Sequence, residues 1–447
     1  VTPDTVFRIA SMTKSFTAIA ILKLRDEGKL ALDDPAEKYV PEMKALVYPT
    51  ADSPKITIRH LLSHAEGFPE DNPWGDQQLA ESDAALSAMI EAGIPFSNAP
   101  GIAYEYSNFG FAILGRIVAN VSRASARGTR GSETDEYTWY VTEHVLKPLG
   151  MASTTLEPAS VPAARLAHGY RWEDGQWKNE PLLANGSFGS MGGMLTTLSD
   201  LGAYVGAFLA AWPPRDGAEG PPIRRASLRE MQQVWRPASA AVTMVSAPSG
   251  GFGAASPRVQ LNSGGYGYGL RISQNCQFPS IVSHSGGLPG FGTLMRWLPE
   301  YGVGVIAFGN LTYSGWSRSV DAAADTLART GGFDENLPFP TPFDEIWTIG
   351  DLTIRSEQLV VLIAVPLIVA FLAMLLQRTK FGLSVRTAAD NPSAASLSGV
   401  RVKAVSTQVW ILAGTLAAVS AVIAAPVLNQ RTSDISNALG PDLLLRG

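Results

Sequence analysis

The chain has 447 residues, which allows two or three domains, and 46% of them are hydrophobic, which allows large buried cores. Its formal net charge is −5, and no basic block or aromatic-interleaved basic stripe is present, so nucleic acid is excluded as an expected partner. The single cysteine, Cys276, excludes an intrachain disulfide and a cysteine metal cluster, and we expect its small side chain to be buried.

The first predicted elements are an extended segment at residues 6–10 and a helix over residues 12–27 that ends at Gly28. This helix is apolar nearly all round, which is typical of a helix buried between two layers. The motif Ser11-Met12-Thr13-Lys14 lies where the two elements meet. A lysine three residues after a serine shares its helix face, so its amine can reach the hydroxyl and, when neutral, activate it. Alone, such a pair is more often solvated helix surface.

The middle of the chain is predicted to consist mostly of helices and loops. Helices are expected at 83–92, 109–121 and 195–211, and an exposed insertion is expected at 122–136, where polar residues, glycines and arginines gather. A second motif, Tyr106-Ser107-Asn108, directly precedes the helix at 109–121.

The pattern changes to short strands separated by glycine turns near residue 280. We expect an antiparallel meander of strands at 281–284, 293–298 and 303–308, followed by a helix at 317–330. The first of these strands carries a third motif, His284-Ser285-Gly286, with Gly287 after it.

The last part of the chain differs from the rest. A proline-rich linker is predicted at 333–350, before a membrane region at 351–447. Two apolar runs, at 359–376 and 409–428, are long enough to span a bilayer, with a buried core hairpin as the alternative. Basic residues dominate the loop at 377–408, so we expect this loop in the cytoplasm and residues 1–332 on the outer side of a cell membrane.

The three motifs, in this order, resemble the signatures of the serine β-lactamase and penicillin-binding-protein superfamily. The similarity is to its branch of class C β-lactamases, DD-peptidases and esterases, and it covers residues 1–332. Segments 56–64 and 189–193 support it. The resemblance implies an α/β fold (α+β), with an antiparallel sheet flanked by helices and a helical subdomain. In that family a helix and at least one strand precede the first motif, so we expect an N-terminally truncated domain.

The resemblance also implies the role of each motif residue. Ser11 is expected to attack a carbonyl and form an acyl-enzyme, while Lys14 and Tyr106 share the proton network. Asn108 is expected to hold Lys14 and a substrate amide, and the N–H groups of Ser11 and Gly287 to form an oxyanion hole. The expected substrate-binding and oxyanion residues are Asn108, His284, Ser285, Gly286 and Gly287. Without the other motifs, Tyr106 is more simply a buried aromatic and Asn108 a turn residue.

The residue type at position 284 helps to distinguish between the subfamilies of this branch. β-Lactamases of this branch typically have lysine at this position, whereas DD-peptidase-like and many esterase-like members have histidine. A histidine that is mostly neutral at pH 7 favours an esterase or peptidase over an efficient β-lactamase. The other histidines lack metal-ligand spacing and are expected to be structural. His60 and His64 stand at i, i+4, which is ligand-like, but no Glu-x-x pattern lies between them, so we predict no metal and no cofactor.

The segment at 377–395 resembles a cytoplasmic loop of branched-chain amino-acid ABC transporter permeases. Two spans cannot form a translocation path, so the tail is either a membrane anchor in a genuine fusion or an artefact of assembly. Three functions therefore remain open. The first is a serine hydrolase acting on an ester, an amide or a D-amino-acid peptide. The second is a non-catalytic ligand-binding relative, and the third is a membrane subunit of a transporter.

Overall fold

The computed structural model divides into two compact units, Val1–Gly332 and Phe333–Gly447. It describes residues 1–125, 131–217, 219–220, 222–245 and 258–330 of the first unit. In the second unit it describes residues 346–349, 352–355, 366, 368, 370–390, 395–396, 398 and 401–409.

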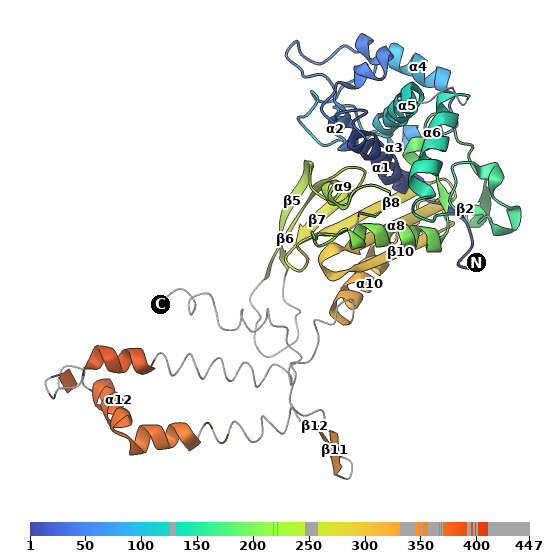
Figure 1. Ribbon diagram of the computed structural model, residues 1–447. Coiled ribbons are helices and arrows are strands. Elements are labelled where there is room, and N and C mark those ends of the chain that lie inside the picture. Colours follow the sequence, from blue (N-terminus) through green and yellow to red (C-terminus); the bar gives the residue numbers. More distant parts are fainter. Residues whose placement is uncertain are drawn as a thin grey trace. The chain divides into compact units, whose positions relative to one another are not determined.

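The first unit contains a six-stranded antiparallel sheet in the order β10-β9-β8-β7-β6-β5 (Figure 1). Its strands are β5 (Arg236–Val245), β6 (Arg258–Tyr266), β7 (Arg271–Asn275), β8 (Ile281–Leu288), β9 (Phe291–Leu298) and β10 (Val303–Gly309). The last three are the meander that the sequence predicts. Two short pairs accompany the sheet: β1 (Phe7–Arg8) with β4 (Leu195–Thr196), and β2 (Gly169–Glu173) with β3 (Gln176–Glu180).

The unit also contains α-helices, and most of them gather beside the sheet in Figure 1. They are α1 (Thr13–Asp26), α2 (Ile58–Leu62), α3 (Asn72–Gln77), α4 (Asp83–Glu91), α5 (Asn108–Ser125), α6 (Glu133–Val141), α7 (Gly189–Gly192), α8 (Leu198–Ala210), α9 (Arg225–Met231) and α10 (Ser317–Thr330). The helices that the sequence predicts at 12–27, 83–92, 109–121, 195–211 and 317–330 correspond to α1, α4, α5, α8 and α10.

The two faces of the sheet carry separate cores, because side chains alternate along a strand. Trp297 of β9 is fully buried against Phe208 of α8, with ring centroids 5.1 Å apart. Its neighbour Leu298 points to the other face, where it packs with Ala324 and Ala328 of α10. The sheet is therefore covered by α8 on one face and α10 on the other.

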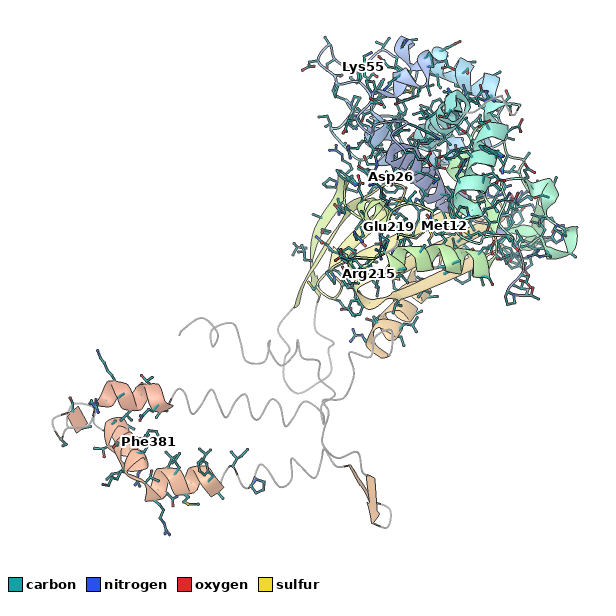
Figure 2. All side chains as sticks on the ribbon, in the orientation of Figure 1. Met12, Asp26, Lys55, Arg215, Glu219 and Phe381 are labelled. Carbon is teal, nitrogen blue, oxygen red and sulfur yellow. The ribbon has the colours of Figure 1, made fainter. Side chains whose placement is uncertain are left out.

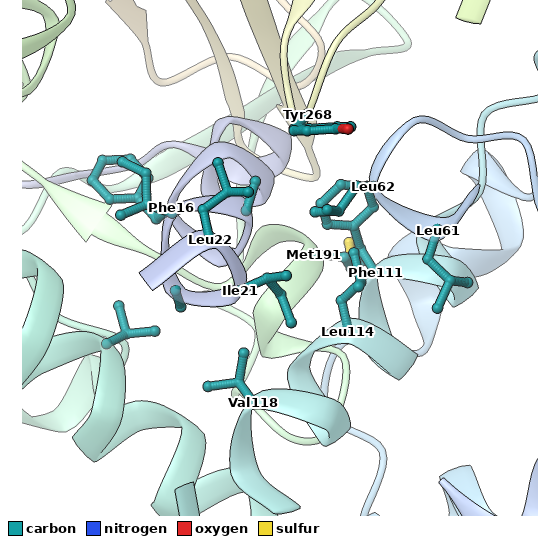
Figure 3. Close-up of a cluster of buried hydrophobic side chains, with 14 of the residues drawn as sticks. Phe16, Ile21, Leu22, Leu61, Leu62, Phe111, Leu114, Val118, Met191 and Tyr268 are labelled. Atoms are coloured by element: carbon teal, nitrogen blue, oxygen red, sulfur yellow. The ribbon is translucent and has the colours of Figure 1, made fainter. Parts of the chain in front are cut away.

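The first helix is the centre of the larger core. Ile21, Leu114 and Val118 are buried without exposed surface, and Figure 3 shows them between α1 and α5. On another side of α1, Phe16 stacks on Tyr204 of α8 with ring centroids 3.9 Å apart. Packing on several sides explains why α1 is apolar nearly all round, and it leaves little freedom at the N-terminal end of the helix.

Two expectations for this unit are wrong in detail. The described ends of the predicted insertion at 122–136 are helical: α5 continues to Ser125, and α6 begins at Glu133 with Ser132 as its cap, while residues 126–130 lie outside the described residues. Ser122 is buried and donates a hydrogen bond to Glu136 (2.6 Å), so polar composition here reflects helix-to-helix pairing. Cys276 is exposed, because it lies in the turn after β7, where its Sγ accepts from the Leu261 N–H (3.3 Å).

The described part of the second unit contains a small hairpin and short helical segments. The hairpin pairs β11 (Ile346–Ile349) with β12 (Leu352–Arg355), so part of the predicted linker is a strand. Helix α12 (Lys380–Asp390) lies within the predicted cytoplasmic loop. No helix among the described residues has both the length and the hydropathy to cross a bilayer. The predicted span at 359–376 lies partly outside the described residues, and the predicted span at 409–428 lies almost wholly outside them.

Candidate active site

Ser11 lies in a tight turn between β1 and α1, close to the third motif. Ala10 adopts φ 49°, a conformation that alanine rarely takes, and such strain is often found at functional sites. The turn is held by the hydroxyl of Thr293, which donates to the carbonyl of Ile9 (3.1 Å). A Cβ at Gly286 would lie 2.0 Å from the same carbonyl, so only glycine permits this close approach of β8. Met12, which follows Ser11 in the sequence, is labelled at the start of α1 in Figure 2.

Lys14 is fully buried, and its ammonium nitrogen has three close oxygen neighbours. The Nζ atom donates to Oδ1 of Asn108 (2.6 Å) and to the carbonyl of Met191 (2.9 Å), and it lies 3.1 Å from Oγ of Ser11. The first two oxygens can only accept. In the neutral amine both N–H bonds are thereby used, and the lone pair is left facing the Ser11 hydroxyl.

Burial makes this neutral form accessible near physiological pH. Desolvation lowers the pKa of Lys14 to about 7, although the negative charges of Asp71 and Asp76 oppose the shift. The nearby Arg271 guanidinium acts in the same direction as burial. Lys14 therefore has both the position and the protonation state of a general base for Ser11.

The pKa of Tyr106 is shifted in the opposite direction from that of Lys14. Its ring is 7% exposed and lies 4.9 Å below Nζ of Lys14. Burial raises the pKa of the Tyr106 phenol above its ordinary value, and hydrogen bonding to Ser11 and the charge of Arg271 only partly offset this effect. The phenol is thus protonated at neutral pH. Two groups whose pKa values are pushed apart can serve as base and acid of one reaction, and a protonated phenol is suited to the part of the acid.

Asn108 is the first residue of α5, and its position is fixed by a carboxylate that the sequence analysis missed. Asp71 accepts hydrogen bonds from the backbone N–H groups of Asn108 (2.6 Å) and Phe109 (2.8 Å). A carboxylate at these unpaired N–H groups stabilises the helix start. Nδ2 of Asn108 also donates to Asn72 (3.2 Å), so both ends of the Asn108 amide are held.

His284 is buried in β8 with both ring nitrogens paired. Nδ1 lies 2.7 Å from the carbonyl of Ser285, which can only accept, so the proton is on Nδ1. Nε2 lies 2.8 Å from the hydroxyl of Tyr266, which then donates to it. Burial lowers the pKa of His284 well below its ordinary value, and the charges of Lys14 and Arg271 act in the same direction. The histidine is therefore neutral.

The motif residues face one cavity of about 560 Å³. Lys14 and Asn108 lie behind the wall of this cavity. The six other predicted residues line it directly: Ser11, Tyr106, His284, Ser285, Gly286 and Gly287. All eight predicted site residues are thus brought together, although oxyanion donation by Ser11 and Gly287 stays a prediction.

The cavity lining also includes residues that the sequence analysis missed, among them Arg271, Asp76 and Tyr313. The guanidinium carbon of Arg271 lies 5.6 Å from the centre of the Tyr106 ring. In the sheet, Arg271 is paired with Ser283, which lies next to the third motif. An isolated arginine in a weakly patterned strand does not indicate a site residue in the sequence.

The remaining histidines have structural partners. His60 completes a capping box at the start of α2, where the N–H of Thr57 donates to its Nδ1 (3.3 Å). His64 is buried, accepts from the N–H of Ser107 (3.1 Å) and packs on the Tyr106 ring at a centroid distance of 4.3 Å. Both therefore support the second motif and its surroundings.

The family comparison agrees with this fold. The model of the Beta-lactamase family matches residues 1–330, so the chain belongs to the β-lactamase family of serine hydrolases and penicillin-binding proteins. A second model, for the permease component of branched-chain amino acid transport systems, matches residues 301–444.

Curated relatives include Protein flp of Staphylococcus aureus. In strain NCTC 8325 / PS 47 it is 28% identical over 315 residues, which cover 69% of this chain and 53% of that protein. Beta-lactamase-like protein 4 of Dictyostelium discoideum is 30% identical over 209 residues, covering 46% of this chain and 36% of that protein. The chain thus spans about half, or less, of the length of these relatives.

Solved structures share the fold at low sequence identity. A penicillin-binding protein homologue from Pyrococcus abyssi superimposes with a TM-score of 0.56 and 23% identity, covering 79% of this chain and 76% of that one. A D-stereospecific amidohydrolase from Streptomyces superimposes with a TM-score of 0.51 and 23% identity, covering 72% and 86%.

Proposed function

We propose that the chain is a serine hydrolase that forms an acyl-enzyme on Ser11. The observation that carries this proposal is the environment of Lys14, whose two N–H bonds are taken by Asn108 and Met191 and whose third neighbour is the Ser11 hydroxyl. In the first step the amine takes the hydroxyl proton while Oγ attacks the substrate carbonyl. Tyr106 then protonates the leaving group, and water hydrolyses the ester bond of the acyl-enzyme.

The substrate proposed is an ester, an amide or a D-amino-acid peptide with a carboxylate on its leaving group. A neutral His284 cannot attract a carboxylate, but the Arg271 guanidinium lies in the same cavity, on the side of the proton donor Tyr106. This favours a peptidase or esterase over an efficient β-lactamase. The Streptomyces protein of similar fold is a D-stereospecific amidohydrolase, which is consistent with this choice.

The test compares a D-alanyl-D-alanine peptide with the same peptide amidated at its C-terminus. We expect the free carboxylate to raise kcat/KM about tenfold or more, since a hydrogen bond between charged groups contributes roughly 1.5–3 kcal/mol. Arg271→Gln should remove this preference and Arg271→Lys should retain part of it. An unchanged preference in Arg271→Gln would mean that another group binds the carboxylate.

A second candidate role concerns the C-terminal unit alone. Because its sequence matches a permease component and carries two apolar runs, we propose that it anchors the hydrolase in a membrane, with the hydrolase outside the cytoplasm. Retention of the full chain in the membrane pellet after alkaline carbonate extraction would support anchoring. Release into the supernatant would contradict it, and copurification with an ATPase would favour the transporter role.

A further inference from the structure

A hydrogen bond in the cavity wall joins the helical part of the unit to the loop that follows the sheet strand β10. The phenol of Tyr313, in the loop after β10, donates to Oδ2 of Asp76 in α3. Both residues line the cavity. The Tyr313 ring lies against Gly287, where an added Cβ would be 2.5 Å from its Cδ1. The backbone N–H of Tyr313 donates to Phe291 (3.1 Å), which fixes the loop against β9.

Asp76 places a carboxylate in this wall, and the charge of Lys14 acts on it without an ion-pair contact between the two side chains. Its residue is only 6% exposed, and among the described residues no lysine, arginine or histidine forms an ion pair with it. Tyr313 occupies Oδ2, while Oδ1 accepts no hydrogen bond from the described part of the chain. A buried carboxylate with one free oxygen, facing a cavity, is suited to bind a cationic ligand group.

The mechanism determines which part of a substrate reaches this wall. The leaving group must meet its proton donor, Tyr106, and therefore lies on the side of Arg271. The acyl group extends from the carbonyl in the other direction. Tyr313 lies against Gly287, the predicted oxyanion donor, and lines the cavity together with Asp76, so the proposal places the acyl group toward these two residues.

We propose that Asp76, held in place by Tyr313, binds a positively charged amine on the acyl group of the substrate. This inference rests on the proposed acyl-enzyme function and narrows its substrate class. Together with Arg271 it gives the cavity an anionic end for the acyl group and a cationic end for the leaving group. A short D-aminoacyl compound with a free amine fits this arrangement, whereas an N-acylated one leaves the Asp76 carboxylate unpaired.

The test uses two p-nitroanilides, D-alanine p-nitroanilide with its free amine and the N-acetyl derivative. Neither has a carboxylate on the leaving group, so Arg271 does not affect the comparison. We expect the intact chain to prefer the free amine about tenfold or more in kcat/KM. Asp76→Asn should reduce the ratio to about one, and Tyr313→Phe should reduce it in part because the carboxylate loses its positioning partner.

Asp174→Asn is the matched control, since Asp174 is an exposed carboxylate in the turn between β2 and β3, and it should keep the full preference. A preference that persists in Asp76→Asn, or its absence from the unmodified chain, would overturn the proposal. Labelling of Ser11 by a fluorophosphonate on the same samples tests the hydrolase function separately. If labelling fails, calorimetric binding of the two p-nitroanilides decides the amine proposal: Asp76→Asn should weaken only the free-amine compound, and equal weakening would contradict it.

Discussion

Replacing Lys14 by methionine lowers the rate of Ser11 acylation by about two to four orders of magnitude, the usual contribution of a general base. Methionine has a similar length and no charge, so it fills the buried site without leaving an unpaired ammonium group. The measurement is the second-order rate of fluorophosphonate labelling, followed by intact mass. Circular dichroism checks that the variant is folded. A rate within about threefold of the unmodified chain would exclude Lys14 as the base, given that a base is worth at least about a hundredfold.

The same assignment predicts the pH dependence of labelling. With its pKa at about 7, Lys14 is an ammonium ion at lower pH and has no lone pair for the Ser11 proton. The labelling rate should therefore fall as the pH decreases below 7 and become constant above it. His284 does not contribute to this profile, because it is already neutral throughout the range. A profile that rises only near pH 10 would instead indicate a tyrosinate or an unperturbed lysine.

Replacing Tyr106 by phenylalanine is expected to separate substrates by their leaving groups. The neutral phenol supplies a proton, which an amine leaving group needs and which p-nitrophenolate, a stable anion, does not. We expect kcat for a peptide or anilide to fall about a hundredfold or more, and kcat for a p-nitrophenyl ester to change far less. The phenylalanine ring preserves the packing on His64. Equal losses on both substrates would show that Tyr106 acts before the leaving group departs, as the base for Ser11.

The helices and strands nearest the motifs could be predicted because their patterns are strong. Helix α1 has an apolar surface nearly all round and ends before Gly28, which adopts φ 73°. Strands β8, β9 and β10 are short runs that are separated by glycine turns at Gly290 and Gly302. By contrast, β6 reads Arg-Val-Gln-Leu-Asn-Ser-Gly-Gly-Tyr, with little apolar alternation, and only its pairing with β5 and β7 makes it a strand.

The site residues can likewise be separated into those that the sequence predicts and those that it does not. Ser11, Lys14, Tyr106 and His284 belong to motifs whose residue types and order are informative on their own. The other four residues, Asp71, Asp76, Arg271 and Tyr313, act through tertiary neighbours that are far away in the sequence. Tyr313 and Asp76, for example, are 237 positions apart. No local pattern distinguishes them from surface residues. The protonation states of Lys14, Tyr106 and His284 could not be predicted from the sequence either. They are set by desolvation, which depends on how the side chains are packed.

The central claim is that Ser11 is an activated nucleophile, and intact mass after incubation with a fluorophosphonate tests it most directly. The full chain and Ser11→Ala should be compared at pH 8, where Lys14 is mostly neutral. A single adduct on the full chain that is absent from Ser11→Ala is the predicted result. A folded full chain that acquires no adduct, or an adduct that persists in Ser11→Ala, would contradict the claim and favour a protein that only binds its ligand.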